Sequence, residues 1–134
     1  MYPGVHAEQR ADQPAIVMAG SGEVVTYRQY EERSNRMAHL LRSEGLRRGD
    51  HLAIFMENHP WYMPVCAAGE RTGLYYTPTN SHLTTDELAY ILRNSESKAL
   101  ITTRPWWASG LEMTAVGILE AAVTYGLGLL FAGH

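Results

Sequence analysis

The stretch GLRRGDHLAIFMENHP, residues 45–60, contains a helix end, a turn and a short apolar segment. Gly45 suits the left-handed residue that follows many helices, and residues 47–50 have the composition of a turn. The near-continuous apolarity of residues 51–55 is typical of a strand that is covered on both faces, as in parallel sheets. The stretch therefore predicts the helix-turn-strand unit of an α/β fold.

The residues before this stretch predict a hairpin and a helix. Two apolar runs flank Gly20-Ser21-Gly22 within residues 15–27, a spacing that indicates a hairpin with a flexible tip. Thr26 and Gln29 have the spacing of a capping box, which predicts a helix start. An apolar stripe continues from there at helical spacing. Its members are Tyr27, Tyr30, Met37, Ala38 and Leu41.

The residues after residue 60 predict a second helix and a second strand. The helix ends at Gly73, and it either starts near Pro64 or kinks there, because an interior proline removes a hydrogen bond and clashes with the preceding turn. Residues 74–77 follow as a strand that Pro78 ends.

A third helix and a further strand complete the predicted layer. Thr84 and Glu87 repeat the capping box, and Leu83 can pack on Leu88 at the start of a helix that runs to about residue 94. Residues 98–102 form the next strand. The alternation of strands and helices from residue 23 to this point predicts an α/β layer with a mostly parallel sheet and crossover helices.

The chain changes character after residue 103. Residues 113–132 are almost all apolar or small, which matches the length of a membrane span. The central acid Glu120 and the glycines of this run instead favour a buried or tail helix. We therefore expect two regions, residues 1–103 as the α/β part and residues 104–134 as a divergent apolar helical tail.

Composition excludes several classes of function. The 134 residues carry a net charge of −3 without a basic run, so nucleic acid is not an expected partner. The single cysteine, Cys66, excludes an internal disulfide framework and fits a reducing compartment. The N-terminus has no apolar signal segment. A cytoplasmic protein is expected, with peripheral membrane contact through the tail as a less favoured option.

Several residue patterns that could suggest a site are better explained by structure. The Gly-Ser-Gly of residues 20–22 and the Gly-Leu-Gly of residues 126–128 lack the strand, helix and lysine of a phosphate loop. The histidines have no spacing typical of a zinc site. The remaining candidates are assigned to turn chemistry or packing rather than to catalysis. They are Asp50 with Glu57, Cys66, and the tryptophans Trp61, Trp106 and Trp107.

Two longer stretches carry a family resemblance. They are TYRQYEERSNRMAHLLRSEGLRRGDHLAIFMEN, residues 26–58, and AAGERTGLYYTPTNSHLTTDELAYILRNSESKALIT, residues 67–102. Together they resemble the N-terminal portion of the adenylate-forming (AMP-binding) enzymes, the superfamily of acyl-CoA synthetases, luciferases and peptide-synthetase adenylation domains. The residue pattern is most similar to that of a fatty-acid-CoA ligase. The resemblance covers residues 2–103 and implies a partial N-terminal lobe of that fold.

The resemblance implies a two-step reaction. A carboxylate attacks the α-phosphate of ATP in the presence of Mg²⁺, which gives an acyl-adenylate and pyrophosphate, and the thiol of CoA then displaces AMP. This chemistry needs a hydroxyl- and glycine-rich phosphate loop, an acid that holds the ribose, a metal-binding carboxylate and a catalytic lysine. The family motifs for these groups do not occur in this sequence, and Lys98, its only lysine, matches a strand start.

From these observations we expect no catalytic, cofactor-binding or metal-binding residue in this chain, and an inactive truncated piece of a fatty-acid-activating ligase. The alternative is a non-catalytic interaction module that complements or docks onto a separate ligase chain. Self-association is a further expectation, since strands built for cover on both faces leave apolar surface and open edges in an isolated piece. A small dinucleotide-binding domain is disfavoured, because G-x-G-x-x-G does not follow the first parallel strand.

Overall fold

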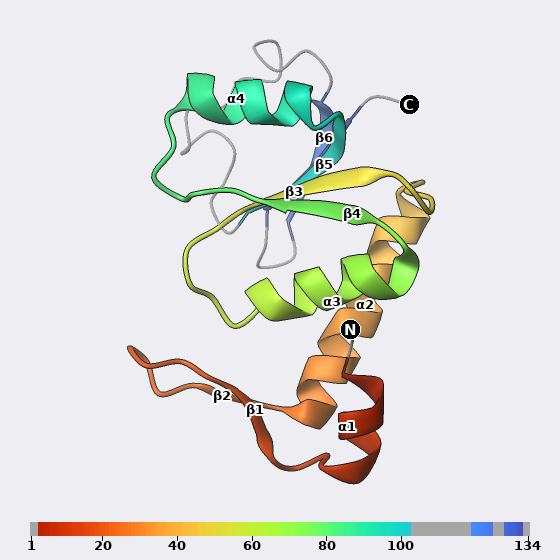
Figure 1. Ribbon diagram of the computed structural model, residues 1–134, viewed down its shortest axis with the longest axis vertical. Coiled ribbons are helices and arrows are strands. Elements are labelled where there is room, and N and C mark those ends of the chain that lie inside the picture. Colours follow the sequence, from red (N-terminus) through yellow and green to blue (C-terminus); the bar gives the residue numbers. More distant parts are fainter. Residues whose placement is uncertain (1–2, 103–118, 125–127, 133–134) are drawn as a thin grey trace. The chain divides into compact units, whose positions relative to one another are not determined.

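The computed structural model describes residues 3–102, 119–124 and 128–132 (Figure 1). The chain divides into two compact units, and each unit is made of two separate chain segments. The first unit comprises residues 1–48 and 58–74, and the second comprises residues 49–57 and 75–134.

The first unit combines helices with a two-stranded hairpin. Its elements are α1 (Gly4–Gln9), β1 (Pro14–Val17), β2 (Val24–Thr26), α2 (Tyr27–Ser43) and α3 (Tyr62–Thr72). The hairpin confirms the sequence prediction, because β1 and β2 pair antiparallel with Val17 opposite Val24. This pair is a sheet of its own, so the first strand of the predicted alternation does not join the parallel layer. Helix α1, a short helix without a side-chain cap, was not predicted from the sequence.

The start of α2 confirms the first capping box. The backbone N–H of Gln29 donates to Thr26 Oγ1 at 3.2 Å, and the N–H of Thr26 donates to Gln29 Oε1 at 3.0 Å. The predicted apolar stripe buries Met37, Ala38 and Leu41, and α2 packs against α3. In this way the amphipathic pattern of α2 builds the centre of the first unit.

Helix α3 resolves the two alternatives for Pro64. The helix begins at Tyr62, which places Pro64 in the first turn. A proline is tolerated there, because the N–H groups of a first turn have no partner inside the helix. The prediction of a start near Pro64 is therefore confirmed.

The second unit is a sheet with one described helix. Its elements are β3 (His51–Phe55), β4 (Tyr75–Pro78), α4 (Thr85–Asn94), β5 (Ser97–Thr102), β6 (Leu119–Thr124) and β7 (Gly128–Ala132). The strand order is β4-β3-β5-β7-β6. Strand β3 pairs parallel with both β4 and β5, which confirms the expected parallel layer and the α/β fold class.

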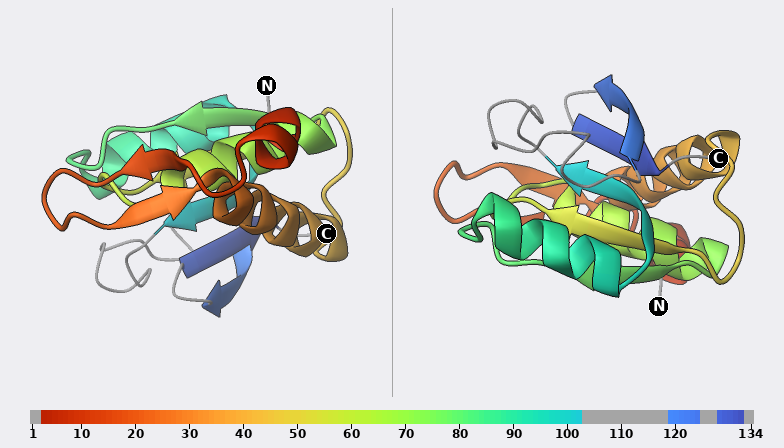
Figure 2. Two further views of the ribbon diagram at one scale, coloured as in Figure 1. Left: turned by 90° about the horizontal axis from the view of Figure 1, so that it is seen from below. Right: turned by 90° about the horizontal axis from the view of Figure 1, so that it is seen from above.

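Helix α4 covers one face of the β3 and β5 strands (Figure 2, right-hand view). Leu88, Ala89 and Leu92 of α4 pack with Phe55 of β3 and Leu100 of β5. Leu83 packs against the same cluster, in line with its predicted contact at the helix start. The second capping box is also confirmed, since Thr84 and Glu87 exchange backbone and side-chain hydrogen bonds. All five residues of β3 are buried or half-buried, as the apolarity of residues 51–55 predicts.

The prediction of a helical tail is wrong for the described part of residues 113–132. Residues 119–124 and 128–132 are strands, and β7 pairs antiparallel with both β5 and β6. A continuous apolar run does not distinguish a buried strand from a buried helix by periodicity, and glycines disfavour a long helix. The rest of this run lies outside the described residues.

No helix in the described ranges has both the length and the apolarity needed to cross a bilayer.

Candidate functional site

A concave surface of the first unit lies where α2 and α3 end. It is a hollow of about 850 Å³, which falls within the size range of small-molecule sites, roughly 300–1,000 Å³. Basic side chains dominate its lining. We call it the arginine hollow, and the lining residues used below are Arg42, Arg47, Arg48, Glu70, Arg71 and Gly73.

The end of α2 forms one wall of the hollow. Gly45 adopts a left-handed conformation with φ of 95°, as the sequence predicts. Its N–H donates to the carbonyl of Arg42 at 3.0 Å, and the N–H of Leu46 donates to the carbonyl of Leu41 at 3.1 Å. This pair of bonds is a Schellman motif, which reverses the chain and turns it back over the helix end.

The end of α3 repeats the same motif. Gly73 has a φ of 74°, its N–H donates to the carbonyl of Glu70 at 3.4 Å, and the N–H of Leu74 donates to the carbonyl of Gly69 at 2.9 Å. Two helix C-termini therefore meet at the hollow. Each carries a partial negative charge of about half an electron, which favours cationic side chains nearby.

Two arginines of the turn after α2 lie against these helix ends. Arg47 Nη1 donates to the carbonyls of Arg42 and Leu46, both at 3.2 Å. The Arg48 side chain crosses Gly73 so closely that a Cβ at position 73 would lie 2.8 Å from Arg48 Cγ. The glycine thus serves two purposes, the left-handed turn and the room for Arg48.

Arg71 is the most firmly held of these guanidinium groups. Its side chain is only 12 % exposed, and its Nη2 lies 2.5 Å from Glu31 Oε1. Its Nη1 donates to Ser34 Oγ at 2.9 Å and also to Asn35 Oδ1. Because the partners Glu31, Ser34 and Asn35 all belong to α2, the network ties α3 to α2 and fixes the guanidinium in place.

A smaller hollow of about 170 Å³ adjoins the first and shares Arg42, Arg71 and Thr72 with it. His39 of α2 contributes to this second lining. The arrangement therefore offers guanidinium groups from two helices and one turn around a common space. The planar guanidinium group of an arginine can donate two parallel hydrogen bonds, like a fork, to two oxygens of a carboxylate or phosphate.

The arginine hollow was not predicted from the sequence, which indicated only a turn at residues 47–50. The available signal was two helix ends that each finish with Gly-Leu next to arginines, at Gly45 and at Gly73. That the two ends lie together depends on the packing of α2 on α3, which no local motif encodes.

Asp50, one of the two acidic candidates beside β3, takes part in hydrogen bonds that hold the sheet together. Asp50 Oδ1 accepts a hydrogen bond from Lys98 Nζ at 2.9 Å, and the N–H of Tyr75 donates to the carbonyl of Asp50. Lys98 lies in β5 and is 58 % exposed, so the pair joins neighbouring strands at the surface of the second unit. His51 stacks on Tyr75 with ring centroids 5.0 Å apart, which joins β3 to β4.

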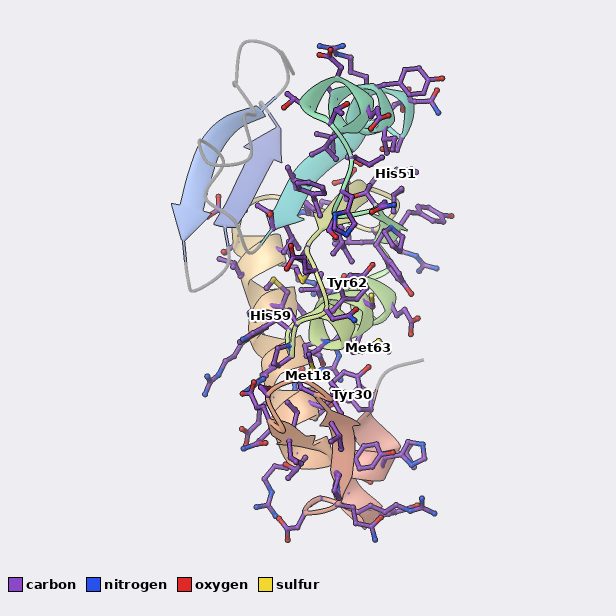
Figure 3. The ribbon with its side chains drawn as sticks, turned by 90° about the vertical axis from the view of Figure 1, so that its left-hand side faces the viewer. Met18, Tyr30, His51, His59, Tyr62 and Met63 are labelled. Atoms are coloured by element: carbon purple, nitrogen blue, oxygen red, sulfur yellow. The ribbon has the colours of Figure 1, made fainter. Side chains whose placement is uncertain are left out.

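Cys66 is buried in α3, in agreement with the predicted packing role. Burial raises the pKa of the Cys66 thiol above its ordinary value, which keeps the thiol neutral at physiological pH. Burial, followed by the charge of Cys66, also raises the pKa values of Tyr30 and Tyr62. Figure 3 shows the side chains of Tyr30, Tyr62, Met63 and Met18 gathered on one side of the first unit.

The remaining candidates that fall within the described residues have a role in the fold. Trp61 precedes α3 and lies under the guanidinium of Arg33, whose Cζ is 5.4 Å from the ring centroid. Residues 20–22 form the hairpin tip, whereas Trp106 and Trp107 lie outside the described residues. In the part of the chain that the structure describes, no group of three His, Cys, Asp or Glu side chains is placed to hold a metal ion.

The model of a known family, described as "AMP-binding enzyme", matches residues 5–125. The chain belongs to this family. The match confirms the resemblance seen in the sequence, and it includes both helix ends of the arginine hollow and the described parallel strands.

The curated proteins to which the chain is similar include ligases and a synthetase. It is 32 % identical over 95 residues to the fatty acid–[acyl-carrier-protein] ligase ScoC of Streptomyces coeruleorubidus, covering 71 % of this chain and 18 % of that protein. The identity is 36 % over 89 residues for the 3-oxocholest-4-en-26-oate–CoA ligase of Rhodococcus rhodochrous, covering 66 % and 16 %. For the acetyl-coenzyme A synthetase of Desulfatibacillum aliphaticivorans it is 33 % over 122 residues, covering 87 % and 18 %. The chain thus spans 16–18 % of the length of these relatives.

Solved structures agree on the fold. A fatty acyl CoA synthetase of Mycobacterium tuberculosis superposes with a TM-score of 0.70 at 27 % identity, covering 75 % of this chain and 20 % of that one. The O-succinylbenzoate coenzyme A synthetase of Bacillus subtilis, in complex with AMP, gives a TM-score of 0.72 at 24 % identity, covering 87 % and 29 %. The second likeness supports the fold alone.

Proposed function

We propose that the protein to which this chain belongs activates a fatty or other carboxylic acid with ATP and passes the acyl group to the thiol of CoA. The family match over residues 5–125 carries this proposal. The similar proteins are a CoA ligase, an acetyl-coenzyme A synthetase and an acyl-carrier-protein ligase, and their names support the reaction class.

In this proposal the chain contributes scaffold rather than reacting groups. The helix-turn-strand unit around residues 45–60 supplies strand β3, with β4 and β5 on either side of it. Motifs that would hold the triphosphate, the ribose and Mg²⁺ do not occur among the 134 residues. No residue of this chain is assigned to these groups in the ligase reaction, so no catalytic step is assigned to this chain, and the chain by itself is proposed to be inactive.

A separately encoded ligase part is the proposed partner if the chain acts on its own as a docking module. In the described part of the second unit, β4 stands at one end of the strand order, and Tyr75 on that strand is 63 % exposed. A strand at the end of a sheet offers unpaired backbone groups to another chain. This observation supports complementation as the second candidate function.

The test is a chimeric ligase in which the 95 residues of this chain that align with the fatty acid–[acyl-carrier-protein] ligase replace the matching segment of that enzyme. Fatty-acid-dependent exchange of pyrophosphate into ATP is expected in the chimera and not in the isolated chain. The matched control carries Leu52→Asp, which places a charge in a fully buried position of β3 and is expected to abolish the exchange.

Each arm of this experiment can contradict the proposal. A chimera that unfolds cooperatively but shows no exchange would overturn the scaffold role. Exchange by the isolated chain would overturn its proposed inactivity. Exchange that appears only after the isolated chain is mixed with the remaining part of the relative would favour the docking module over a continuous polypeptide.

A further inference from the structure

The arginine hollow has an excess of positive charge beyond what its helix ends require. Among its lining residues are four arginines and one carboxylate, Glu70. The two helix C-termini contribute about half a negative charge each, and Glu31 pairs with Arg71 from α2. The four guanidinium groups exceed these negative groups by about one unit charge, so the lining is basic on balance.

The hollow is also pre-organised. The bonds from Arg71 to Glu31, Ser34 and Asn35 fix its guanidinium before any ligand arrives. Arg47 is oriented by two backbone carbonyls at 3.2 Å, and the contact with Gly73 sets the path of Arg48. Groups that are already ordered lose little conformational entropy when they bind, which favours affinity.

From this geometry we propose that the arginine hollow binds a soluble small molecule that carries two or more phosphate groups. Several guanidinium forks around one space match the many oxygens and the multiple charge of a polyphosphate better than they match a single carboxylate. The volume of about 850 Å³ leaves room for a diphosphate with an organic substituent. The site uses only residues of the first unit and does not depend on the proposed ligase function.

The test measures the binding of inorganic pyrophosphate to the full 134-residue chain by titration calorimetry at low ionic strength, without Mg²⁺. Saturable binding with one site per chain is expected. The variant Arg42→Gln with Arg48→Gln is expected to weaken binding by about tenfold or more, equivalent to at least one lost charge-assisted contact. The matched control, Arg28→Gln, removes an exposed arginine that pairs with Asp12 near the hairpin and is expected to leave the affinity unchanged within about twofold.

A second variant separates binding from folding. Arg42→Lys with Arg48→Lys keeps the charge but removes the planar forks, and it is expected to fold and to bind with intermediate affinity. Circular dichroism spectra recorded at the temperature of the titration check that all variants are folded.

Four results would overturn the proposal. They are the absence of saturable binding to the wild-type chain, equal affinity for sulfate and pyrophosphate, equal losses in the control and the double variants, and binding only to phosphatidylcholine vesicles that contain phosphatidic acid. The last result would assign the surface to a lipid headgroup instead of a soluble polyphosphate. None of these results bears on pyrophosphate exchange by the chimeric ligase, so the two proposals fail separately.

Discussion

Arg71 of α3 and Glu31 of α2 form an ion pair in which Nη2 lies 2.5 Å from Oε1, with side chains only 12 % and 21 % exposed. Removing one partner leaves the other charge largely buried and unpaired. Arg71→Met is therefore expected to lower the free energy of unfolding by about 3 kcal/mol, measured by urea denaturation. Replacing both residues by Met is expected to restore more than half of the loss, because no isolated charge then remains.

The surface pair between Lys98 and Asp50 is the control for this prediction. Lys98 is 58 % exposed, so Lys98→Met is expected to cost under about 1 kcal/mol. Similar losses for Arg71→Met and Lys98→Met would contradict the conclusion that burial makes the ion pair of Arg71 with Glu31 the more stabilising of the two.

Gly73→Ala is expected to destabilise the chain by about 1–2 kcal/mol, because an L-residue is strained at a φ of 74°. The contact with Arg48 Cγ, 2.8 Å from the new Cβ, adds to this cost. Thermal unfolding of Gly73→Ala and of the double variant Gly73→Ala with Arg48→Ala separates the backbone strain from the clash. The Arg48→Ala substitution removes the clash and leaves the strain.

Gly20→Ala is the matched comparison, because nothing lies within 4 Å of its Cβ position and its φ is not left-handed. This substitution is expected to be neutral or slightly stabilising. A cost for Gly20→Ala equal to that for Gly73→Ala would refute the argument from backbone conformation.

Thr84→Ala is expected to cost about 1 kcal/mol, because it removes the side-chain oxygen that accepts from the Glu87 N–H at the start of α4. Thr84→Ser keeps the hydroxyl and is expected to retain most of that stability. The difference between the two variants in urea denaturation measures the cap. If both variants lose the same amount, the capping box does not stabilise α4.

Local chemistry made much of the fold predictable from the sequence. Interactions between residues a few positions apart determine the capping boxes at Thr26 and Thr84 and the left-handed turn at Gly45. The structure confirms all three. Apolarity alone did not decide between helix and strand in residues 119–124 and 128–132, which are strands β6 and β7. The arginine hollow was not predictable, because it exists only where two distant helix ends meet.

Cys66 is expected to react with alkylating reagents at least about tenfold more slowly in the native chain than in the urea-unfolded chain. The thiol is buried, and burial raises its pKa, so both access and thiolate population are reduced. The control is Ser21→Cys in a Cys66→Ala background, which places the thiol at the exposed hairpin tip and is expected to react at the same rate in both states.

The raised pKa of the Cys66 thiol also predicts how the stability of the chain depends on pH. Because the folded state holds the thiol proton more tightly, the contribution to stability is complete below the ordinary thiol pKa and is lost as pH rises through the raised value. Tyr30 and Tyr62 shift in the same direction, so Cys66→Ala should reduce but not abolish the loss of stability at alkaline pH. Identical pH dependence of unfolding in wild type and Cys66→Ala, together with fast native alkylation, would show that the thiol is accessible and unperturbed.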